Sequence, residues 1–287
     1  MRLKTIKLPA SYNYIACFLT LECKLGCNYC INTFRAPGRA KRQLILGPEW
    51  VEALNRLDCP SDTPVTLQGG EPSLHPDFIW IINHLKDSLN IDILTNLDFD
   101  VGMFIRQVNP QRLKRAAPYP SIRISYHPDR MDLDELIAKT LQLQKADFSV
   151  GIFGVLYPPL LEKIRLAKEK CLARGIDFRT KEFLGEFNQT LHGSYRYPGA
   201  VGQPKHQSCL CRTTELILGS QGNVYRCHHD FYKDFPHVGN LLDPGFEIKD
   251  IFRECDCFGD CNPCDVKIKT NRFQIFGHSS VEVKNIK

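Results

Sequence analysis

Hydrophobic and polar positions along the first two-thirds of the chain follow two alternating patterns. Six short β-rich runs, several of them near-continuously apolar, lie at residues 14–20, 64–68, 91–95, 121–126, 148–157 and 176–184. Such runs are typical of strands in a parallel sheet, because both faces of that kind of sheet are buried. The stretches between them carry an apolar residue every three or four positions, which predicts amphipathic helices.

Local signals support several of these helices. Pro48 and Pro76 each precede an apolar stripe, and proline is well tolerated in the first turn of a helix. Two further stripes cover residues 133–141 and 160–167, and Gly175 follows the second where a helix stop is expected. The chain therefore alternates strand and helix from residue 14 to residue 184.

This alternation predicts repeated right-handed βαβ units and an α/β fold. Six units make three-quarters of a (β/α)₈ barrel, so we expect a partial (β/α)₆ open TIM-type barrel over residues 1–190. In such barrels catalytic residues lie at the carboxyl ends of the strands. Residues that could take part in binding or catalysis follow four of the expected strands. They are Cys23, Cys27 and Cys30, then Gly69 to Pro72, then Asn96, then Ser125 and His127.

The pattern changes after residue 190. Residues 191–208 are rich in glycine, proline and polar side chains, which predicts a linker. Residues 209–287 begin with a hairpin around residues 220–223 and continue as an irregular, cysteine-rich segment. Because this segment has few apolar residues, we expect a small second domain folded around metal.

Composition and charge narrow the class of protein. No apolar run approaches the ~20 residues of a membrane helix, and the first residues lack the apolar core of a secretory signal. We therefore expect a cytoplasmic protein that does not bind membranes. The net charge of +5 comes mostly from bases interleaved with acids, which does not indicate nucleic acid. A basic group without acids, Arg35, Arg39, Lys41 and Arg42, is either a solvated loop or an anion-facing rim.

Thirteen cysteines fall mainly into two groups. In a chain without an export signal, clustered cysteines indicate metal or redox chemistry rather than disulfides. The first group, Cys23, Cys27 and Cys30, has the spacing C-x3-C-x2-C. Structural zinc needs four ligands. A cubane iron–sulfur cluster with three cysteine ligands instead keeps one iron open, as a catalytic centre requires.

The first cysteine group resembles the cluster motif of the radical S-adenosylmethionine (SAM) superfamily, including Tyr29 before the last cysteine. The stretch Gly69-Gly70-Glu71-Pro72 resembles the second motif of that family. The resemblance covers roughly residues 10–185. It implies that an open iron of a [4Fe-4S] cluster chelates SAM, and that Glu71 pairs with the SAM ammonium group.

The resemblance implies further SAM contacts from residues that end later strands. By position these are Asn96 and Ser125, while His127 is either a structural residue or a SAM or substrate contact. The chain departs from the family at Leu97, where many members have glycine.

The second cysteine group resembles the SPASM and twitch extensions, which bind auxiliary iron–sulfur clusters. The resemblance rests on the spacing between Cys211, Gly222 and Cys227, and the tail departs from the full SPASM pattern. Seven cysteines are one short of two cubane clusters, so we expect one auxiliary [4Fe-4S] cluster. Its expected ligands are Cys211, Cys227, Cys261 and Cys264, with Cys209, Cys255 and Cys257 as alternates. A structural zinc knot stays open.

The family resemblance implies a function. SAM is cleaved reductively to a 5′-deoxyadenosyl radical, which abstracts hydrogen from a peptide or small-molecule substrate, with a flavodoxin or ferredoxin-type protein as reductant. Two alternatives stay open: an activating enzyme for a glycyl-radical or other protein partner, and a non-catalytic iron–sulfur or zinc module. The Gly69–Pro72 motif and the order of sites along the barrel count against the second alternative.

Overall fold

A computed structural model describes residues 4–34, 43–60, 62–269 and 277–287. Its central feature is a nine-stranded sheet in the order β14-β13-β12-β2-β4-β5-β6-β7-β8. Six consecutive strands of this sheet are parallel and match the six predicted runs to within a few residues. They are β2 (Tyr14–Thr20), β4 (Val65–Gly69), β5 (Ile91–Thr95), β6 (Ile122–Tyr126), β7 (Val150–Leu156) and β8 (Phe178–Glu182). The predicted α/β class with a large parallel sheet is confirmed.

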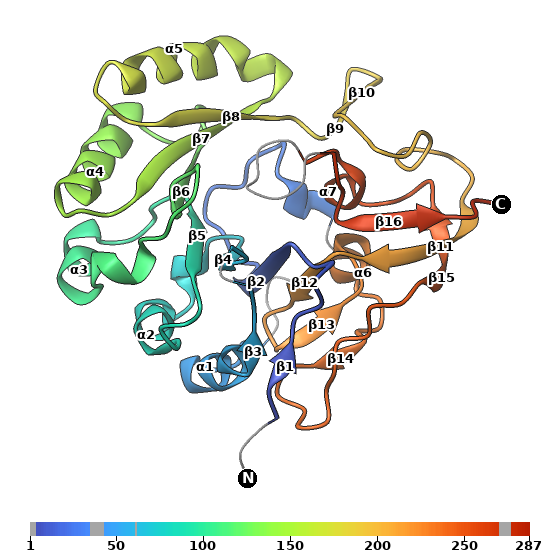
Figure 1. The fold of residues 1–287 in the computed structure, drawn as a ribbon. Helices are drawn as coiled ribbons and strands as arrows, with labels where there is room; N and C mark the ends of the chain where they lie inside the picture. The colour runs from blue at the N-terminus through green and yellow to red at the C-terminus, as the bar shows by residue number, and fades with distance from the viewer. Residues whose placement is uncertain (1–3, 35–42, 61, 270–276) are drawn as a thin grey trace.

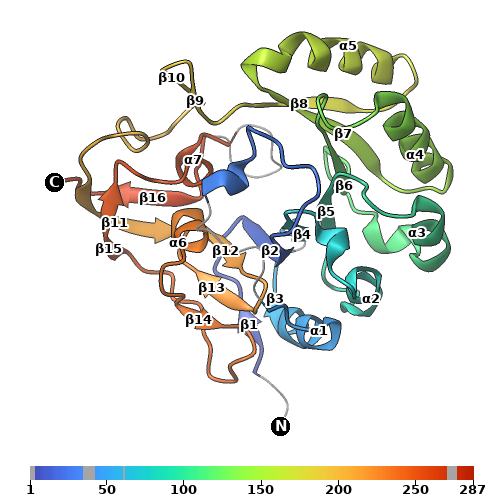
Figure 2. The ribbon, with the colours of Figure 1, turned by 180° about the vertical axis from the view of Figure 1, so that it is seen from behind.

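Five helices connect these strands and cover the outer face of the sheet, as Figures 1 and 2 show from opposite sides. They are α1 (Gly47–Asn55), α2 (Phe78–His84), α3 (Val101–Gln107), α4 (Leu133–Lys145) and α5 (Leu161–Leu172). The main hydrophobic core lies between helices and sheet, and Trp50 and Phe104 are fully buried in it. Pro48 lies in the first turn of α1, and Gly175 follows α5 with a φ of +72°. Both predicted helix signals are confirmed.

The C-terminal chain continues the same sheet. Strands β12 (Glu215–Leu218) and β13 (Asn223–Tyr225) form the predicted hairpin, and β14 (Gly239–Asn240) pairs with β13. Strand β12 pairs in parallel with β2, so the hairpin extends the large sheet beyond the six predicted strands. Short helices α6 (His228–Lys233) and α7 (Pro263–Val266) lie beside it.

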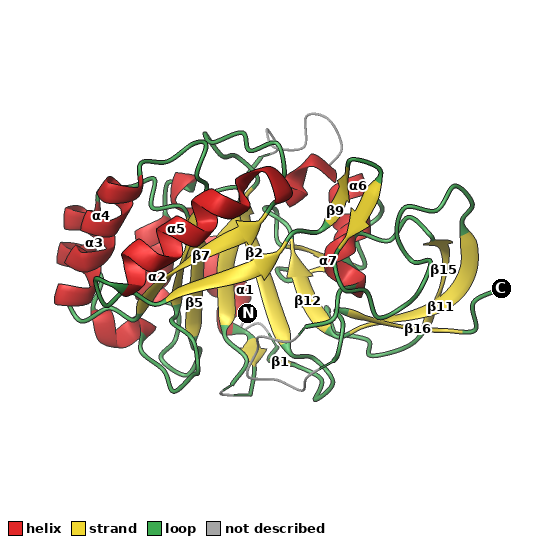
Figure 3. Ribbon diagram, turned by 90° about the horizontal axis from the view of Figure 1, so that it is seen from above, coloured by secondary structure: helices red, strands yellow, loops and turns green. Residues whose placement is uncertain are grey.

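The remaining strands form three small sheets. Strands β11 (Gln207–Thr213), β15 (Arg253–Phe258) and β16 (Val281–Lys284) make a sheet with β11 in the middle. Figure 3 shows it extending away from the large sheet. A hairpin joins β9 (Gly185–Phe187) to β10 (Thr190–His192), and β1 (Ile6–Lys7) pairs with β3 (Leu57–Asp58). Within the described part of the chain, no helix combines the length and apolarity of a membrane span.

Candidate active site

A cavity of about 930 Å³ lies against the inner face of the sheet. Eight residues predicted for the cluster and SAM site line it, from the loop after β2 and from the ends of β4, β5 and β6: Cys23, Cys27, Tyr29, Cys30, Gly69, Gly70, Asn96 and Ser125. The opposite wall comes from β8 and the C-terminal region, with Lys181, Glu215 and Lys269. Ligand pockets usually measure about 300–1,000 Å³, so the cavity has the size of a binding site.

The cysteine loop presents its three thiols at this cavity. Cys23 is exposed, Cys30 is half-buried and Cys27 is buried. Burial and the neighbouring Cys30 raise the pKa of Cys27 to about 12, so a bound metal would be needed to keep that sulfur as a thiolate. The Asn96 side-chain amide donates to Sγ of Cys23 at 3.7 Å. Three cysteines of one loop on one cavity, with an amide donor beside Cys23, fit the ligand set of an iron–sulfur cluster.

Glu71 makes several hydrogen bonds within the protein. The side chain is buried, and it does not belong to the cavity lining. Its carboxylate accepts hydrogen bonds from the Ser73 amide at 3.1 Å, the Ser73 and Thr95 hydroxyls at 2.7 Å, and the Asn96 amide at 2.7 Å. Burial raises the pKa of Glu71, and these donors oppose the rise. The carboxylate is therefore occupied in joining the ends of β4 and β5.

The two glycines before Glu71 permit a close approach of backbones. A Cβ on Gly69 would lie 1.9 Å from the Thr20 carbonyl oxygen, and one on Gly70 would lie 2.1 Å from that of Glu22. The Gly70 amide donates to the Thr20 carbonyl at 2.9 Å. The glycines thus hold the end of β4 against the loop that leads to Cys23. Pro72, which follows Glu71, is buried and begins a short 3-10 turn, Pro72–Leu74.

Tyr29 and His127 meet at the rim of the cavity. The Tyr29 hydroxyl lies 2.9 Å from Nδ1 of His127, and the Tyr29 ring stacks on Tyr157 with centroids 4.7 Å apart. Burial lowers the pKa of His127, which favours the neutral imidazole. His127 therefore positions the tyrosine of the cysteine loop against Tyr157, which follows β7.

Leu97 stands where many members of the family have glycine, and its environment shows how leucine fits there. Its backbone has a φ of +59°, a left-handed conformation that favours glycine. Its amide donates to the Thr95 hydroxyl at 2.9 Å, and its side chain is buried in the main core. Leucine is accepted here because burial of its side chain offsets the backbone strain.

Three of the four predicted auxiliary ligands line the same cavity. Cys211, Cys227 and Cys261 line one small cavity, whereas Cys264 lines the large one. Two predicted alternates, Cys255 and Cys257, take part in the small cavity. Antiparallel pairing of β11 with β15 also places Cys209 opposite Cys255.

Several residues that line the cavity could not be identified as site residues from the sequence. Glu215 and Lys269 form a buried ion pair there, and they meet only because β12 enters the sheet beside β2. His228 also lines the cavity, and its Nδ1 lies 2.9 Å from a carboxylate oxygen of Asp265. The basic group Arg35, Arg39, Lys41 and Arg42 lies outside the described residues.

Comparisons with known proteins bear on this arrangement. No family model and no curated protein matches the chain. Among solved structures it is similar to anSMEcpe with bound AdoMet and Kp18Cys peptide, with a TM-score of 0.54, 13% identity, and coverage of 83% of this chain and 78% of that one. AnSMEcpe with AdoMet and Cp18Cys peptide gives a TM-score of 0.52, 12% identity, and coverage of 80% and 77%. The chain has the radical SAM fold.

The resemblance noted from the sequence is therefore confirmed at the level of the fold. With AdoMet alone, anSMEcpe gives a TM-score of 0.54 at 12% identity, and the match covers 80% of this chain and 78% of that one. AdoMet is the SAM of the predicted reaction. The site therefore belongs to a fold in which a relative of similar architecture binds this molecule.

Proposed function

We propose that this protein is a radical SAM enzyme. The observation that carries the proposal is the convergence of Cys23, Cys27 and Cys30 with Asn96 and Ser125 on one cavity. When bound, the cluster supplies the electron that breaks the C5′–S bond of SAM and yields the 5′-deoxyadenosyl radical. We also infer that β2 and β4 to β8 form the expected partial (β/α)₆ barrel, because six parallel strands with intervening helices follow in chain order.

The residues of the chain would bind the cluster and SAM, orient them, and exclude water from the site. Cys23, Cys27 and Cys30 would hold the cluster at the mouth of the cavity, with the Asn96 amide hydrogen-bonded to Cys23. Ser125 would contact SAM directly. Glu71 fixes the position of Asn96 through the backbone amide of that residue, and so acts as a positioning residue. Tyr29, packed on Tyr157, would shield the radical from solvent.

A peptide is the substrate class we propose first. The solved anSMEcpe structures hold Cp18Cys and Kp18Cys peptides, and the cavity has room for a second ligand beside SAM. A small molecule is the alternative. We propose a flavodoxin or ferredoxin-type reductant, since the exposed Cys23 gives a redox partner access to the cluster, and a cytoplasmic location.

The central test removes the cluster ligands. We expect the Cys23→Ala/Cys27→Ala/Cys30→Ala variant to lose about four irons per chain and all dithionite-dependent formation of 5′-deoxyadenosine from SAM. The assay is iron analysis and chromatography on anaerobically reconstituted protein. The Cys59→Ala/Cys171→Ala variant is the control, because these isolated cysteines lie outside both cavities, and it should keep both properties. Wild-type rates in the triple variant would disprove the proposal.

A further inference from the structure

The C-terminal cysteines include two C-x-C motifs on neighbouring strands. Cys209 and Cys211 belong to β11, and Cys255 and Cys257 belong to β15. Alternate residues of a strand share a face, so each motif presents both thiols on one side. The two strands run antiparallel with Cys209 directly opposite Cys255. Pairing of these strands therefore gathers the thiols of Cys209, Cys211 and Cys255 into one patch, with Cys257 next along the same face of β15.

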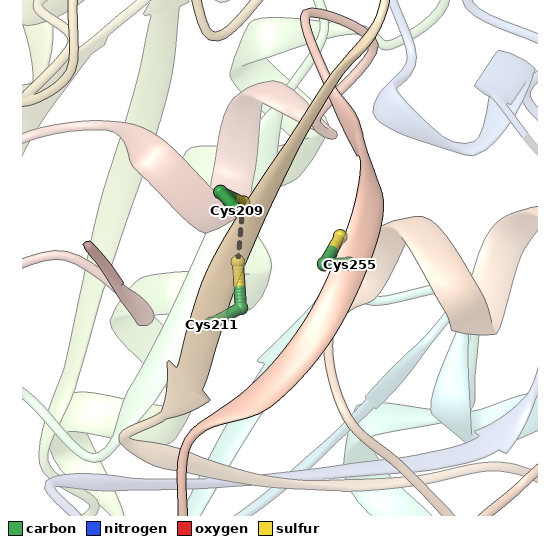
Figure 4. A group of neighbouring side chains, drawn as sticks. All are labelled: Cys209, Cys211 and Cys255. Atoms are coloured by element: carbon green, nitrogen blue, oxygen red, sulfur yellow. Dashed lines mark hydrogen bonds between the residues drawn. The ribbon is translucent and has the colours of Figure 1, made fainter. Parts of the chain in front are cut away.

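The spacing within this patch is that of ligands to a single ion. Sγ of Cys209 lies 3.4 Å from Sγ of Cys211, and both lie within 4.8 Å of Sγ of Cys255 (Figure 4). Tetrahedral zinc with Zn–S bonds of about 2.3 Å requires sulfur atoms about 3.8 Å apart. In a cubane cluster each thiolate binds a different iron, so the sulfurs must lie further apart.

The cysteine loop at the active site provides a contrast. Among the described residues, Cys209, Cys211 and Cys255 are the one group of three potential ligand atoms gathered within 4.8 Å. Cys23, Cys27 and Cys30, which are all described, are spaced more widely than this. The two cysteine sites therefore differ in the size of the metal centre that they fit.

Cys257 is the best-placed fourth ligand. It lies outside that group of three, but it shares a face of β15 with Cys255, and both line the same small cavity as Cys211. The other two thiols of this cavity, those of Cys227 and Cys261, lie outside β11 and β15 and outside the group of three close thiols. Sγ of Cys227 accepts from the Asp230 amide at 3.4 Å and caps α6, and Sγ of Cys261 lies 3.9 Å from the Cys257 carbonyl oxygen.

We propose that Cys209, Cys211, Cys255 and Cys257 form a tetrathiolate site for a single divalent ion of the zinc class. This ion is separate from the cluster at Cys23, Cys27 and Cys30. It joins β11 to β15 in a region whose hydrophobic core is small. The site is structural, because four protein ligands leave no open position on the ion.

The wild-type chain provides the first test. Purified anaerobically from medium that contains both metals, it should carry about one zinc per chain in addition to its iron. Zinc-edge X-ray absorption should show four sulfur neighbours at about 2.3 Å. The Cys23→Ala/Cys27→Ala/Cys30→Ala variant should keep the zinc while it loses the iron. This readout is independent of SAM cleavage, so failure of the zinc site and failure of the radical SAM proposal are distinguishable.

Single variants test the ligand set. In the wild-type background, Cys255→Ser or Cys257→Ser should reduce zinc at least tenfold, whereas Cys264→Ser and Cys227→Ser should leave it unchanged. About eight irons and no zinc would overturn the proposal in favour of the auxiliary cubane cluster. A zinc-free protein with a Cys209–Cys255 disulfide would also overturn it. If the serine variants do not fold, fewer than four sulfur neighbours around the wild-type zinc would still refute the ligand set.

Discussion

The four hydrogen bonds to Glu71 change the interpretation of the Gly69–Pro72 motif. A carboxylate next to an ammonium group is a reasonable expectation from the motif alone, because charge-assisted hydrogen bonds are strong. In the structure the same carboxylate accepts hydrogen bonds from backbone amides and hydroxyl groups of Ser73, Thr95 and Asn96. Sequence places Glu71 at the correct strand end. It does not reveal the partners, because Thr95 and Asn96 come from a neighbouring strand.

We predict that Glu71→Gln destabilises the protein as well as weakening SAM binding. The new side-chain amide cannot accept from all of these donors, and an unpaired buried polar group costs about 1–3 kcal/mol. Urea denaturation should show this loss of unfolding free energy, and calorimetry the weaker SAM binding. Ser73→Ala is the matched control, because it removes one hydroxyl donor and should cost about 1 kcal/mol. An unchanged free energy of unfolding together with weaker SAM binding would instead indicate that Glu71 contacts SAM directly.

Helices and strands of the first two-thirds of the chain could be predicted because their signals are local. The predicted runs at residues 14–20 and 91–95 match β2 and β5 residue for residue, and Pro48 marks the start of α1. The contacts between elements could not be predicted in the same way. The Gly-Gly pair indicates a close approach, but only the structure identifies the partner as the backbone of Thr20 and Glu22.

We predict that Gly70→Ala disturbs the cysteine loop. The added methyl group would meet the Glu22 carbonyl oxygen at 2.1 Å, and backbone on both sides must shift. Forced overpacking of this kind costs about 1–3 kcal/mol. Because Cys23 follows Glu22, iron content after reconstitution should fall together with thermal stability. Gly245→Ala is the control, since its Cβ would meet only Asp243 Oδ1 at an ordinary 3.5 Å. Normal iron content in Gly70→Ala would contradict this interpretation.

The architecture of the whole chain depends on pairings between distant segments. Strand β12 enters the large sheet beside β2, and Phe231 of α6 packs on Phe18 with ring centroids 4.4 Å apart. Arg56, at the end of α1, donates to the Leu241 and Asp243 carbonyls after β14. No local pattern encodes these contacts, which is why the sequence predicted the hairpin but placed it in a separate domain beyond residue 208.

We predict that residues 1–190 do not fold stably alone. Without β12, the paired edge of β2 becomes an open strand of buried residues, and Tyr14 and Phe18 lose the apolar side chains that cover them. An exposed apolar edge of this kind promotes aggregation. The fragment should therefore be insoluble, or soluble without a cooperative unfolding transition, when compared with the full chain by circular dichroism.

Hydrogen exchange on the intact protein provides the control for truncation. If β12 belongs to the cooperative unit of the large sheet, amides of residues 215–218 should exchange as slowly as those of β2. Amides of β15, at the edge of the small sheet, should exchange faster. A soluble fragment 1–190 that unfolds cooperatively, together with fast exchange in β12, would show that the barrel is stable without its C-terminal strands and would favour the division at residues 191–208.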